Sequence, residues 1–369
     1  MAGLYFHIPF CKRICAYCDF HRFADLRGMA DVLQAMHAEL EETRGFLHDR
    51  RVRSVYFGGG TPSLAAPAEL QRFIDHAADI YDLQQSAEIT AEVNPDDITR
   101  EYVAALRRTD LNRISIGIQS FDDRVLRLMN RRHTAGQGED AVKRLQDAGF
   151  DNITADMIFG IDGFGDEVVR RDLECMTALG VRHVSAYHLT IEPSTRFGLM
   201  EERGELRAIE EAVSEQLFAM IHHTLTAAGF EHYEVSNYAL EGFRSRHNSS
   251  YWDGTEYLGT GPGAHSYNGE QRRWCRQRPV EYAAARSYES ELLDERDRFN
   301  ETVMTSLRRI EGLDLETVER RFGRERAERL RSEAAKLTGY GVECTERQIK
   351  IAPERMLTSD SAIAALFEA

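Results

Sequence analysis

Short apolar runs alternate with segments of helical spacing from Leu4 to Val235. Leu4–Ile8 is typical of a buried strand, and Met29–Arg44 has the spacing of an amphipathic helix. Because a strand, a loop and a helix recur in this order, the pattern indicates βα units and a parallel sheet. Further strands are predicted at Val52–Phe57, Ala87–Val93, Arg113–Ile118, Asn152–Phe159 and His183–Leu189, with helices near Ala68–Tyr81, Arg100–Arg108, Ala135–Ala148 and Glu167–Leu179.

Six such units are too few for a closed eight-stranded barrel. We therefore predict an α/β protein with a partial (β/α)6 barrel of the TIM type, whose open side could take a bulky substrate. In parallel barrels the active site lies at the carboxyl ends of the strands. Polar and glycine-rich residues that follow the strands should then meet at one mouth of the barrel.

The pattern divides the chain into three parts. Residues 1–236 form the predicted barrel, which ends with a helix near Ala208–Ala228 and a seventh short strand at Glu231–Ser236. Residues 237–296 are predicted as a loop-rich connecting region, rich in Gly, Tyr and Asn at its start. Residues 297–369 return to helical spacing with one short strand, which resembles a winged-helix module. Such modules bind DNA or serve as docking units.

Composition narrows the class of protein. Of the 369 residues, 42% are apolar and 29% charged, as in a soluble protein with a packed core. No apolar run approaches the roughly 20 residues of a membrane span, and no signal peptide is visible. The net charge of −15 disfavours nucleic acid as a partner, so docking is the favoured role of the last module. We expect a cytoplasmic protein.

Three cysteines lie within eight residues, at Cys11, Cys15 and Cys18. Clustered thiolates hold iron–sulfur clusters, and a cubane usually takes four. Three close thiolates without a nearby fourth can hold a [4Fe-4S] cube with one iron open to a small molecule. Zinc is the alternative, since His7 and His21 could complete a four-ligand set. A disulfide framework is disfavoured because the other three cysteines are scattered singly.

The C-x3-C-x2-C spacing, with the aromatic Tyr17 before the last cysteine, resembles the radical S-adenosylmethionine (SAM) superfamily. The resemblance implies that the open iron chelates the amine and carboxylate of SAM. Gly58-Gly59-Gly60-Thr61-Pro62 follows a predicted strand, and glycines let the backbone approach a ligand closely. It lacks the Lys-Ser/Thr of a phosphate-binding loop, and in this superfamily a run at this place receives the SAM amine.

Polar side chains stand at the ends of later strands. Glu92 could accept both ribose hydroxyls of a nucleoside, and Gln119 and Asp156 offer further polar groups. Arg131 could pair with the carboxylate of SAM in bidentate fashion, or be an ordinary surface arginine. A local turn role would explain any one of these positions, but less readily their repeated place after strands.

Together these segments resemble the oxygen-independent coproporphyrinogen III oxidase group of radical SAM proteins. The resemblance is carried by Tyr5–Phe20, Gly58–Ser63, Glu92–Asp96, Arg113–Asp122 and Asp156–Gly160. It implies that Cys11, Cys15 and Cys18 bind the cluster, and that SAM is lined by Tyr5, Tyr17, Gly59, Gly60, Thr61, Glu92, Gln119, Arg131 and Asp156.

Within this group the chain is more similar to the heme-chaperone branch than to the oxidases. The oxidases carry a further cysteine two residues after the third ligand and an extension before the first strand. Here that position is Phe20, and three residues precede the strand. The mark of the chaperone branch is H-N-x-x-Y-W, and the chain has it at His247–Trp252. Gly160-Ile161-Asp162-Gly163 departs from the group's G-L-P-G form, which affects the loop shape only.

The chemistry of the new motif suits heme, whose iron takes His, Cys, Met or Tyr ligands. His247 is the predicted axial ligand, and Tyr251 and Trp252 offer aromatic surfaces for the macrocycle. A structural histidine in a loop is the alternative role for His247, and His265 and Cys275 are rival ligands. The arginines of the segment 272–278 form either a solvated loop or a patch for the propionates.

The sequence therefore predicts a heme chaperone that carries a SAM-ligated [4Fe-4S] cluster and transfers heme to acceptor hemoproteins. A second copy of the chain is a candidate partner. The alternative is an oxygen-independent coproporphyrinogen III oxidase, in which a deoxyadenosyl radical would start oxidative decarboxylation of propionates. Phe20 counts against that enzyme. DNA binding by the last module is a third, weaker interpretation.

Overall fold

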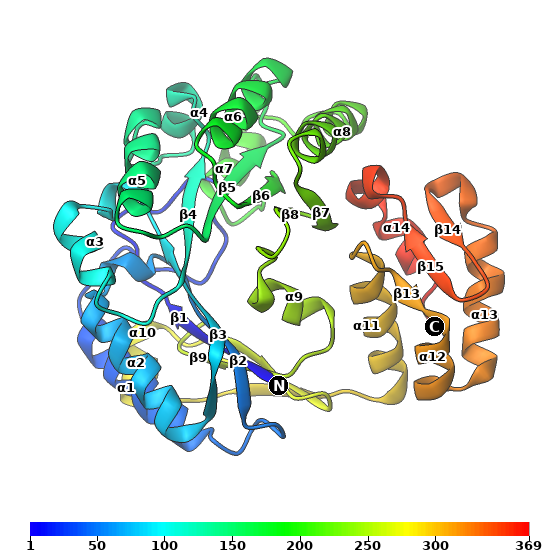
Figure 1. The fold of residues 1–369 in the computed structure, drawn as a ribbon, viewed down its shortest axis with the longest axis horizontal. Coiled ribbons are helices and arrows are strands. Elements are labelled where there is room, and N and C mark those ends of the chain that lie inside the picture. Colours follow the sequence, from blue (N-terminus) through cyan, green and yellow to red (C-terminus); the bar gives the residue numbers. More distant parts are fainter. Residues whose placement is uncertain (369) are drawn as a thin grey trace.

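Parallel strands β1 to β6, with β9 beside β1, form the middle of a 12-stranded sheet. The computed structural model describes residues 1–368. The sheet curves into an open barrel with helices along its outside, and a smaller helical module lies at one side (Figure 1). The parallel strands are β1 (Ala2–Ile8), β2 (Arg51–Gly59), β3 (Asp82–Val93), β4 (Arg113–Gln119), β5 (Ile153–Phe159), β6 (His183–His188) and β9 (Tyr257–Thr260).

The helices of the barrel occur where the sequence predicts them, with three short additions. The predicted helices are α1 (Met29–Glu42), α2 (Pro67–Ile80), α3 (Arg100–Leu106), α5 (Ala135–Asp147), α6 (Asp166–Ala178) and α8 (Glu211–Ala227). The additions are α4 (Asp123–Leu128), α7 (Arg196–Glu202) and α10 (Pro279–Ala284). Helices this short span two turns at most, so their apolar spacing is too brief to be detected. The prediction of an α/β partial barrel is confirmed.

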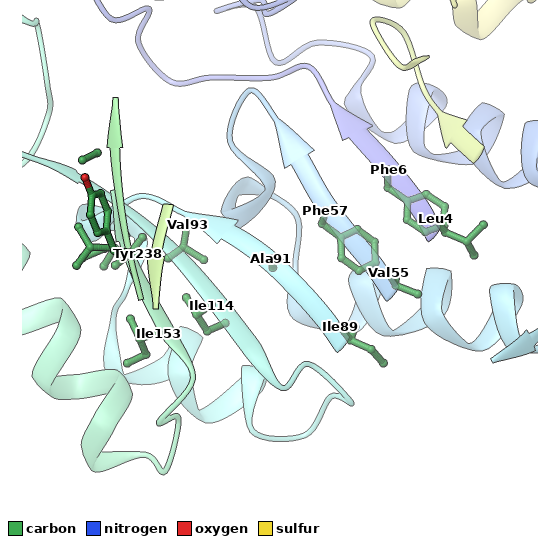
Figure 2. Close-up of a cluster of buried hydrophobic side chains, with 14 of the residues drawn as sticks. Leu4, Phe6, Val55, Phe57, Ile89, Ala91, Val93, Ile114, Ile153 and Tyr238 are labelled. Atoms are coloured by element: carbon green, nitrogen blue, oxygen red, sulfur yellow. The ribbon is translucent and has the colours of Figure 1, made fainter. Parts of the chain in front are cut away.

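The core between the sheet and its outer helices comes from one face of each strand. Strand register places Leu4 of β1 opposite Val55 of β2, and Val55 opposite Ile89 of β3. Figure 2 shows these side chains on neighbouring strands. The ring of Phe6 lies 5.0 Å from that of Phe57 and 4.9 Å from that of Phe73 on α2. Because side chains alternate across a strand, the other face points into the barrel.

The lumen face of the same strands is polar and aromatic. Tyr5 of β1 pairs in register with Tyr56 of β2, and Tyr56 pairs with Thr90 of β3. Glu92 lies two residues beyond Thr90, on the same face and nearer the carboxyl end of the strand. The alternation therefore separates an apolar core outside the sheet from a functional interior.

The region 237–296, predicted as loop-rich, adds strands to both sides of this sheet. β8 pairs antiparallel with β6 at one edge and carries β7 outside it. Beyond β9, the strands β10 to β12 extend the other edge antiparallel. They are only three or four residues long, which explains why they show no clear period. β7 (Glu231–Glu234) corresponds to the predicted seventh strand at Glu231–Ser236. The elements that follow it, besides β9 and α10, are β8 (Asn237–Ala239), α9 (Arg246–Trp252), β10 (His265–Tyr267), β11 (Gln271–Trp274) and β12 (Glu289–Leu292).

The C-terminal module combines helices with a small antiparallel sheet in the order β13-β15-β14. This is a winged-helix-like arrangement, and it lies beside α9 in Figure 1. A 3-10 helix at Pro353–Thr358 precedes the last helix of the module. The elements are α11 (Glu295–Leu307), β13 (Leu313–Asp314), α12 (Leu315–Phe322), α13 (Arg324–Ala335), β14 (Val342–Cys344), β15 (Gln348–Ile351) and α14 (Asp360–Ala364).

Within residues 1–368, none of the helices combines the length and the apolar character that crossing a membrane requires.

The packing of Phe6 makes a prediction for stability. Phe6 is fully buried against Phe57 and Phe73. Phe6→Ala should lower the free energy of unfolding by about 3–5 kcal/mol, because it removes buried apolar area and leaves a cavity. Denaturant unfolding measures this. Phe20→Ala is the matched control, since Phe20 is 62% exposed and its loss should cost well under about 1 kcal/mol. Equal losses in the two variants would contradict the described core.

Candidate functional site

A cavity of about 460 Å³ lies at the carboxyl ends of β1 to β6, and we call it the upper cavity. Its walls come from segments far apart in the sequence, as expected for a parallel barrel. Of the residues predicted to bind the cluster or SAM, it is lined by Cys11, Cys15, Tyr17, Cys18, Gly59, Gly60, Thr61, Glu92, Gln119, Arg131 and Asp156. Tyr5 is not among the lining residues. It lies deeper in the barrel, where its hydroxyl is 3.1 Å from Nδ1 of His7.

The three clustered cysteines are free thiols on the loop after β1. Thr61 donates a hydrogen bond to Sγ of Cys11 at 3.4 Å, and Arg131 donates to Sγ of Cys15 at 3.3 Å. Burial raises the pKa of Cys11 and raises that of Cys18 to about 11. Bound iron favours thiolates, and the two donors can stabilise their negative charge.

The spacing of these thiols fits a cluster better than a single ion. In the part of the chain that the structure describes, no three His, Cys, Asp or Glu side chains are close enough together to hold one metal ion. In a cubane each cysteine binds its own iron, so the thiolates stand further apart. His7 has no free nitrogen for zinc as placed, because its Nε2 lies 2.8 Å from the carbonyl oxygen of His21 and its Nδ1 lies 3.1 Å from the hydroxyl of Tyr5. Nε2 of His21 lies 2.8 Å from the carbonyl oxygen of Gln277.

The glycine run after β2 packs directly against the cysteine loop. Gly59 has a φ of +107°, which side-chain-bearing residues rarely adopt, and a Cβ there would lie 2.8 Å from the ring of His7. A Cβ on Gly60 would lie 2.7 Å from the carbonyl oxygen of Phe10. Glycine at these positions lets the backbone reach both the cavity and the cysteine loop.

Two buried carboxyl groups face the upper cavity. Burial, with the nearby charge of Asp156, raises the pKa of Glu92 to about 8, although Tyr56 donates to its Oε1 at 2.9 Å. Burial also raises the pKa of Asp156 to about 6, against hydrogen bonds from Ser115 and Ser185. A polar ligand that donates hydrogen bonds would compensate this desolvation, as ribose hydroxyls can.

Gln119 and Arg131 form another part of the wall of the upper cavity. Gln119 has a left-handed φ of +70°, and its Oε1 is buried without a partner among residues 1–368. Strain and an unpaired acceptor together mark a ligand-facing position. Nη2 of Arg131 donates to Oδ1 of Asn94 at 2.8 Å and to the carbonyl of Gly117 at 2.6 Å. Pairing with a ligand carboxylate would therefore require Arg131 to exchange some of these bonds. The sequence did not single out Asn94, which only its place after β3 could have indicated.

The H-N-x-x-Y-W motif forms α9, which lies at the opposite, amino end of the strands. Glu88 of β3 holds the start of this helix. It accepts hydrogen bonds from the backbone N–H groups of Arg246 at 2.9 Å and His247 at 3.0 Å, and from Oγ of Ser245 at 3.3 Å. No sequence pattern indicates this role for Glu88, because a carboxylate in the middle of a strand has no local signal of its partner. It anchors α9 to the base of the barrel.

His247 points into the barrel and is only 1% exposed. Its Nδ1 lies 3.1 Å from Oγ of Ser54 and its Nε2 lies 2.9 Å from the hydroxyl of Tyr251. Its ring stacks on Tyr56, with centroids 4.8 Å apart, and burial lowers its pKa to about 3. As placed, His247 has no free nitrogen for heme iron, so its predicted role as axial ligand would require α9 to move.

These contacts make a continuous line of side chains that we call the aromatic column. It runs from Glu92 in the upper cavity through Tyr56 and His247 to Tyr251. Tyr251 in turn meets Tyr257 with ring centroids 4.8 Å apart. The column connects the predicted SAM site with the predicted heme motif.

Tyr251 and Trp252 line a second cavity, of about 320 Å³, between α9 and the C-terminal module. We call it the lower cavity. Tyr251 is 37% exposed. The guanidinium of Arg308 lies 5.8 Å from the ring of Trp252, which ties this side chain to α11 and the module.

The arginines of the segment 272–278 do not act as one patch. Arg272 lines the lower cavity, but Arg273 lies over Phe46 and Tyr288, on another side of β11. Arg276 is exposed, and Arg278 precedes α10 as its N-cap. The alternative of a single patch formed by all these arginines does not hold, because Arg272 and Arg273 point to opposite faces of β11 and Arg276 and Arg278 lie beyond this strand. Of the rival ligands, Cys275 is buried and His265 is exposed beside Trp274.

Comparison with known proteins shows the family. The model of the radical SAM superfamily matches residues 5–176. The "Heme chaperone HemW" of Lactococcus lactis is 36% identical over 326 residues, 86% of this chain and 84% of that protein. That of Escherichia coli is 35% identical over 71% of this chain and 69% of its own. The chain belongs to the HemW family of radical SAM proteins.

The solved structure of the coproporphyrinogen III oxidase HemN from Escherichia coli shares the fold. It matches with a TM-score of 0.83 over 99% of this chain and 89% of that one, at 21% identity. Membership of the radical SAM superfamily implies a [4Fe-4S] cluster and SAM, and the upper cavity has residues that suit both. In this HemW-family chain, Phe20 stands at the rim of that cavity, where the sequence analysis places a cysteine in the oxidases.

The cysteine loop makes a prediction for the cluster. Cys15→Ser should abolish binding of the cluster, because the two remaining thiolates cannot hold it in place. Iron content and the visible spectrum after anaerobic reconstitution measure this. Cys175→Ser is the control, since Cys175 lies on α6 outside the upper cavity and should keep the full load. Retention of about four irons per chain in Cys15→Ser would refute the assignment.

The raised pKa of Glu92 makes a prediction for pH dependence. Folding lifts its pKa from 4.5 to about 8, so the folded chain binds this proton more tightly than the unfolded chain. The contribution to stability is then complete below about pH 4.5 and is lost as the pH rises towards 8. Glu92→Gln should remove this loss, so that unfolding of the cluster-free variant weakens less between pH 5 and pH 8, by a few kcal/mol at most. Parallel pH profiles of variant and parent would contradict it.

Proposed function

We propose that this chain is a heme chaperone, which binds heme at α9 and transfers it to acceptor hemoproteins. One observation carries the proposal. The H-N-x-x-Y-W segment is a helix that presents Tyr251 and Trp252 to a cavity of its own, apart from the clustered cysteines. Relatives at 35–36% identity are named heme chaperones. Aromatic walls suit a flat apolar macrocycle.

The upper cavity is proposed to hold the cluster and SAM. Cys11, Cys15 and Cys18 would bind three irons, and the backbone at Gly59 and Gly60 would lie against the amine of SAM. Glu92 and Asp156 would accept hydrogen bonds from the nucleoside, and Gln119 and Arg131 would face its polar groups. When bound, this pair supplies one-electron reduction and, if SAM is cleaved, a deoxyadenosyl radical. In a carrier it would regulate transfer or association of two copies.

The C-terminal module is proposed as a docking unit for the acceptor hemoprotein. It forms one wall of the lower cavity through α11 and α12. Its helices therefore adjoin the place from which heme would leave. The net charge of −15 makes nucleic acid a poor partner. Free thiols at the cluster loop agree with a reducing compartment such as the cytoplasm.

A coproporphyrinogen III oxidase is the second candidate, and the shared fold with HemN favours it. The upper cavity could receive a propionate-bearing substrate above SAM. Phe20 at its rim, 62% exposed, is the main difference from the oxidases that the sequence analysis identifies. A direct assay of coproporphyrinogen turnover with SAM and a reductant separates the two candidates.

An anaerobic titration of the cluster-reconstituted protein with ferric heme tests the proposal. We expect saturable binding with a change in the heme absorption spectrum, and no turnover of coproporphyrinogen. We expect His247→Ala to weaken binding and leave the cluster intact, because it removes the support of Tyr251 and α9. His265→Ala is the control, since His265 lies on β10 and stacks on Trp274. Absence of saturable binding, together with turnover, would replace the chaperone with the oxidase.

A further inference from the structure

The lower cavity contains more positive charge than its ion pairs use. Four arginines line it, from β11, α11, the loop after α11, and α12. Arg272 pairs with Glu301 at 2.9 Å, and Arg309 pairs with Glu311 at 3.0 Å. Within residues 1–368, Arg298 and Arg321 have no carboxylate within ion-pair distance.

The acidic residues of the same cavity already have partners within the chain. Asp253 pairs with Arg53 at 2.7 Å. Asp314 caps α12 and accepts from the hydroxyl of Thr317 at 2.6 Å. With Glu301 and Glu311 also paired, no carboxylate of residues 1–368 forms an ion pair with Arg298 or Arg321, and the guanidinium of Arg321 lies 5.0 Å from the ring of Phe322.

A tyrosine pair places these arginines next to α9. The guanidinium of Arg272 lies 5.9 Å from the ring of Tyr267, and Arg298 and Arg321 line the same cavity as this ring. The ring of Tyr267 lies 6.0 Å from that of Tyr257, which in turn meets Tyr251 at 4.8 Å. Nε of Arg272 is buried and has no partner within residues 1–368, so a polar group is left unsatisfied on this wall.

Tyr251 and Trp252 of the motif both line this cavity, and of the two only Tyr251 has a side-chain oxygen atom that can bind iron. It lines the cavity and is 37% exposed, whereas His247 behind it is 1% exposed. Its hydroxyl lies 2.9 Å from Nε2 of His247, whose Nδ1 is 3.1 Å from Oγ of Ser54. If Nε2 carries the proton, it donates to the phenol oxygen. The phenol oxygen is then held in one position by a buried donor.

We propose that the lower cavity binds heme through Tyr251 on the iron and through Arg298 and Arg321 on the two carboxylates. The inference rests on the proposed function and adds to it the residues that contact heme. Tyrosine is an established axial ligand of heme iron. Arginine pairs with carboxylates by charge-assisted hydrogen bonds, in bidentate geometry where both are planar. His247 is a positioning residue in this arrangement and does not contact the iron.

Binding of Tyr251 to iron requires the loss of its phenol proton. When ferric heme binds, Tyr251 would lose its phenol proton to solvent through the open cavity. The buried imidazole of His247 would stay neutral, carry its own proton on Nε2 and donate a hydrogen bond to the phenolate oxygen. Any water on the iron leaves to solvent, and the ferric state does not change. Transfer reverses this step, since return of the proton to Tyr251 weakens its bond to iron. One exchangeable ligand on an open cavity suits a carrier better than two.

The first test compares Tyr251→Phe with His247→Ala in titrations with ferric heme, followed by absorption and electron paramagnetic resonance. We expect the parent to give the high-spin ferric spectrum of a tyrosinate ligand and Tyr251→Phe to lose it. His247→Ala should keep this signature with an affinity reduced about tenfold or more, as expected when a hydrogen bond that positions the ligand is lost. A low-spin spectrum that disappears in His247→Ala and persists in Tyr251→Phe would overturn the proposal.

The second test addresses the carboxylates. Arg298→Glu with Arg321→Glu should weaken heme binding at least about tenfold, since two charge-assisted bonds are lost. The charge-matched control is Arg296→Glu with Arg320→Glu, at two exposed residues of α11 and α12 that do not line the cavity. Iron protoporphyrin with both propionates esterified should bind the parent and the cavity variant equally weakly.

The two levels of failure can be told apart. If the parent binds no heme, the proposed function itself fails. If the parent binds heme and the cavity variant binds it as tightly as the control variant, the chaperone stands and the assignment of Arg298 and Arg321 is wrong.

Discussion

The buried carboxylate of Glu88 determines how the two ends of the barrel relate. It accepts two backbone hydrogen bonds and one hydroxyl bond from the start of α9, and lies 3.9 Å from Nε of Arg113. A charge this deep is costly unless it is paired and fully hydrogen-bonded. The cost is offset only when α9 is in place. The helix therefore closes the amino end of the barrel in one position. This position stacks His247 on Tyr56 and places Tyr251 in the wall of the lower cavity.

This constraint keeps the cysteine loop and the H-N-x-x-Y-W motif at opposite ends of the barrel. The clustered cysteines lie at the carboxyl ends of the strands, and the aromatic motif lies at their amino ends. The aromatic column is the link between them: from Glu92, one hydrogen bond leads to Tyr56 and one ring stack leads to His247. A ligand that moved Glu92 would act on the partner of Tyr251 through two contacts. If these contacts have two arrangements, they give the upper cavity a physical route by which to regulate the proposed heme transfer.

The barrel and the residues of the upper cavity could be predicted from the sequence, because both follow from short-range patterns. Strand and helix periods give the βα units, and parallel strands bring residues such as Cys11, Glu92 and Asp156 to one mouth. The lining of the lower cavity could not be predicted in the same way. The short strands β9 to β12 lack a period, and they decide that Arg272 faces the cavity while Arg273 does not. The burial of His247 depends on Glu88, about 160 residues earlier, and no local pattern shows that pairing.

Locating the irons in an anaerobic crystal of the heme-loaded, cluster-reconstituted protein would test the central claim most directly. Anomalous scattering at the iron edge shows each iron independently of the rest of the structure. We expect two separate iron positions: a cluster at Cys11, Cys15 and Cys18, and a single iron next to Tyr251 at the other end of the barrel. A heme iron in the upper cavity, above the cluster, would contradict the account and place the macrocycle where an oxidase would bind its substrate.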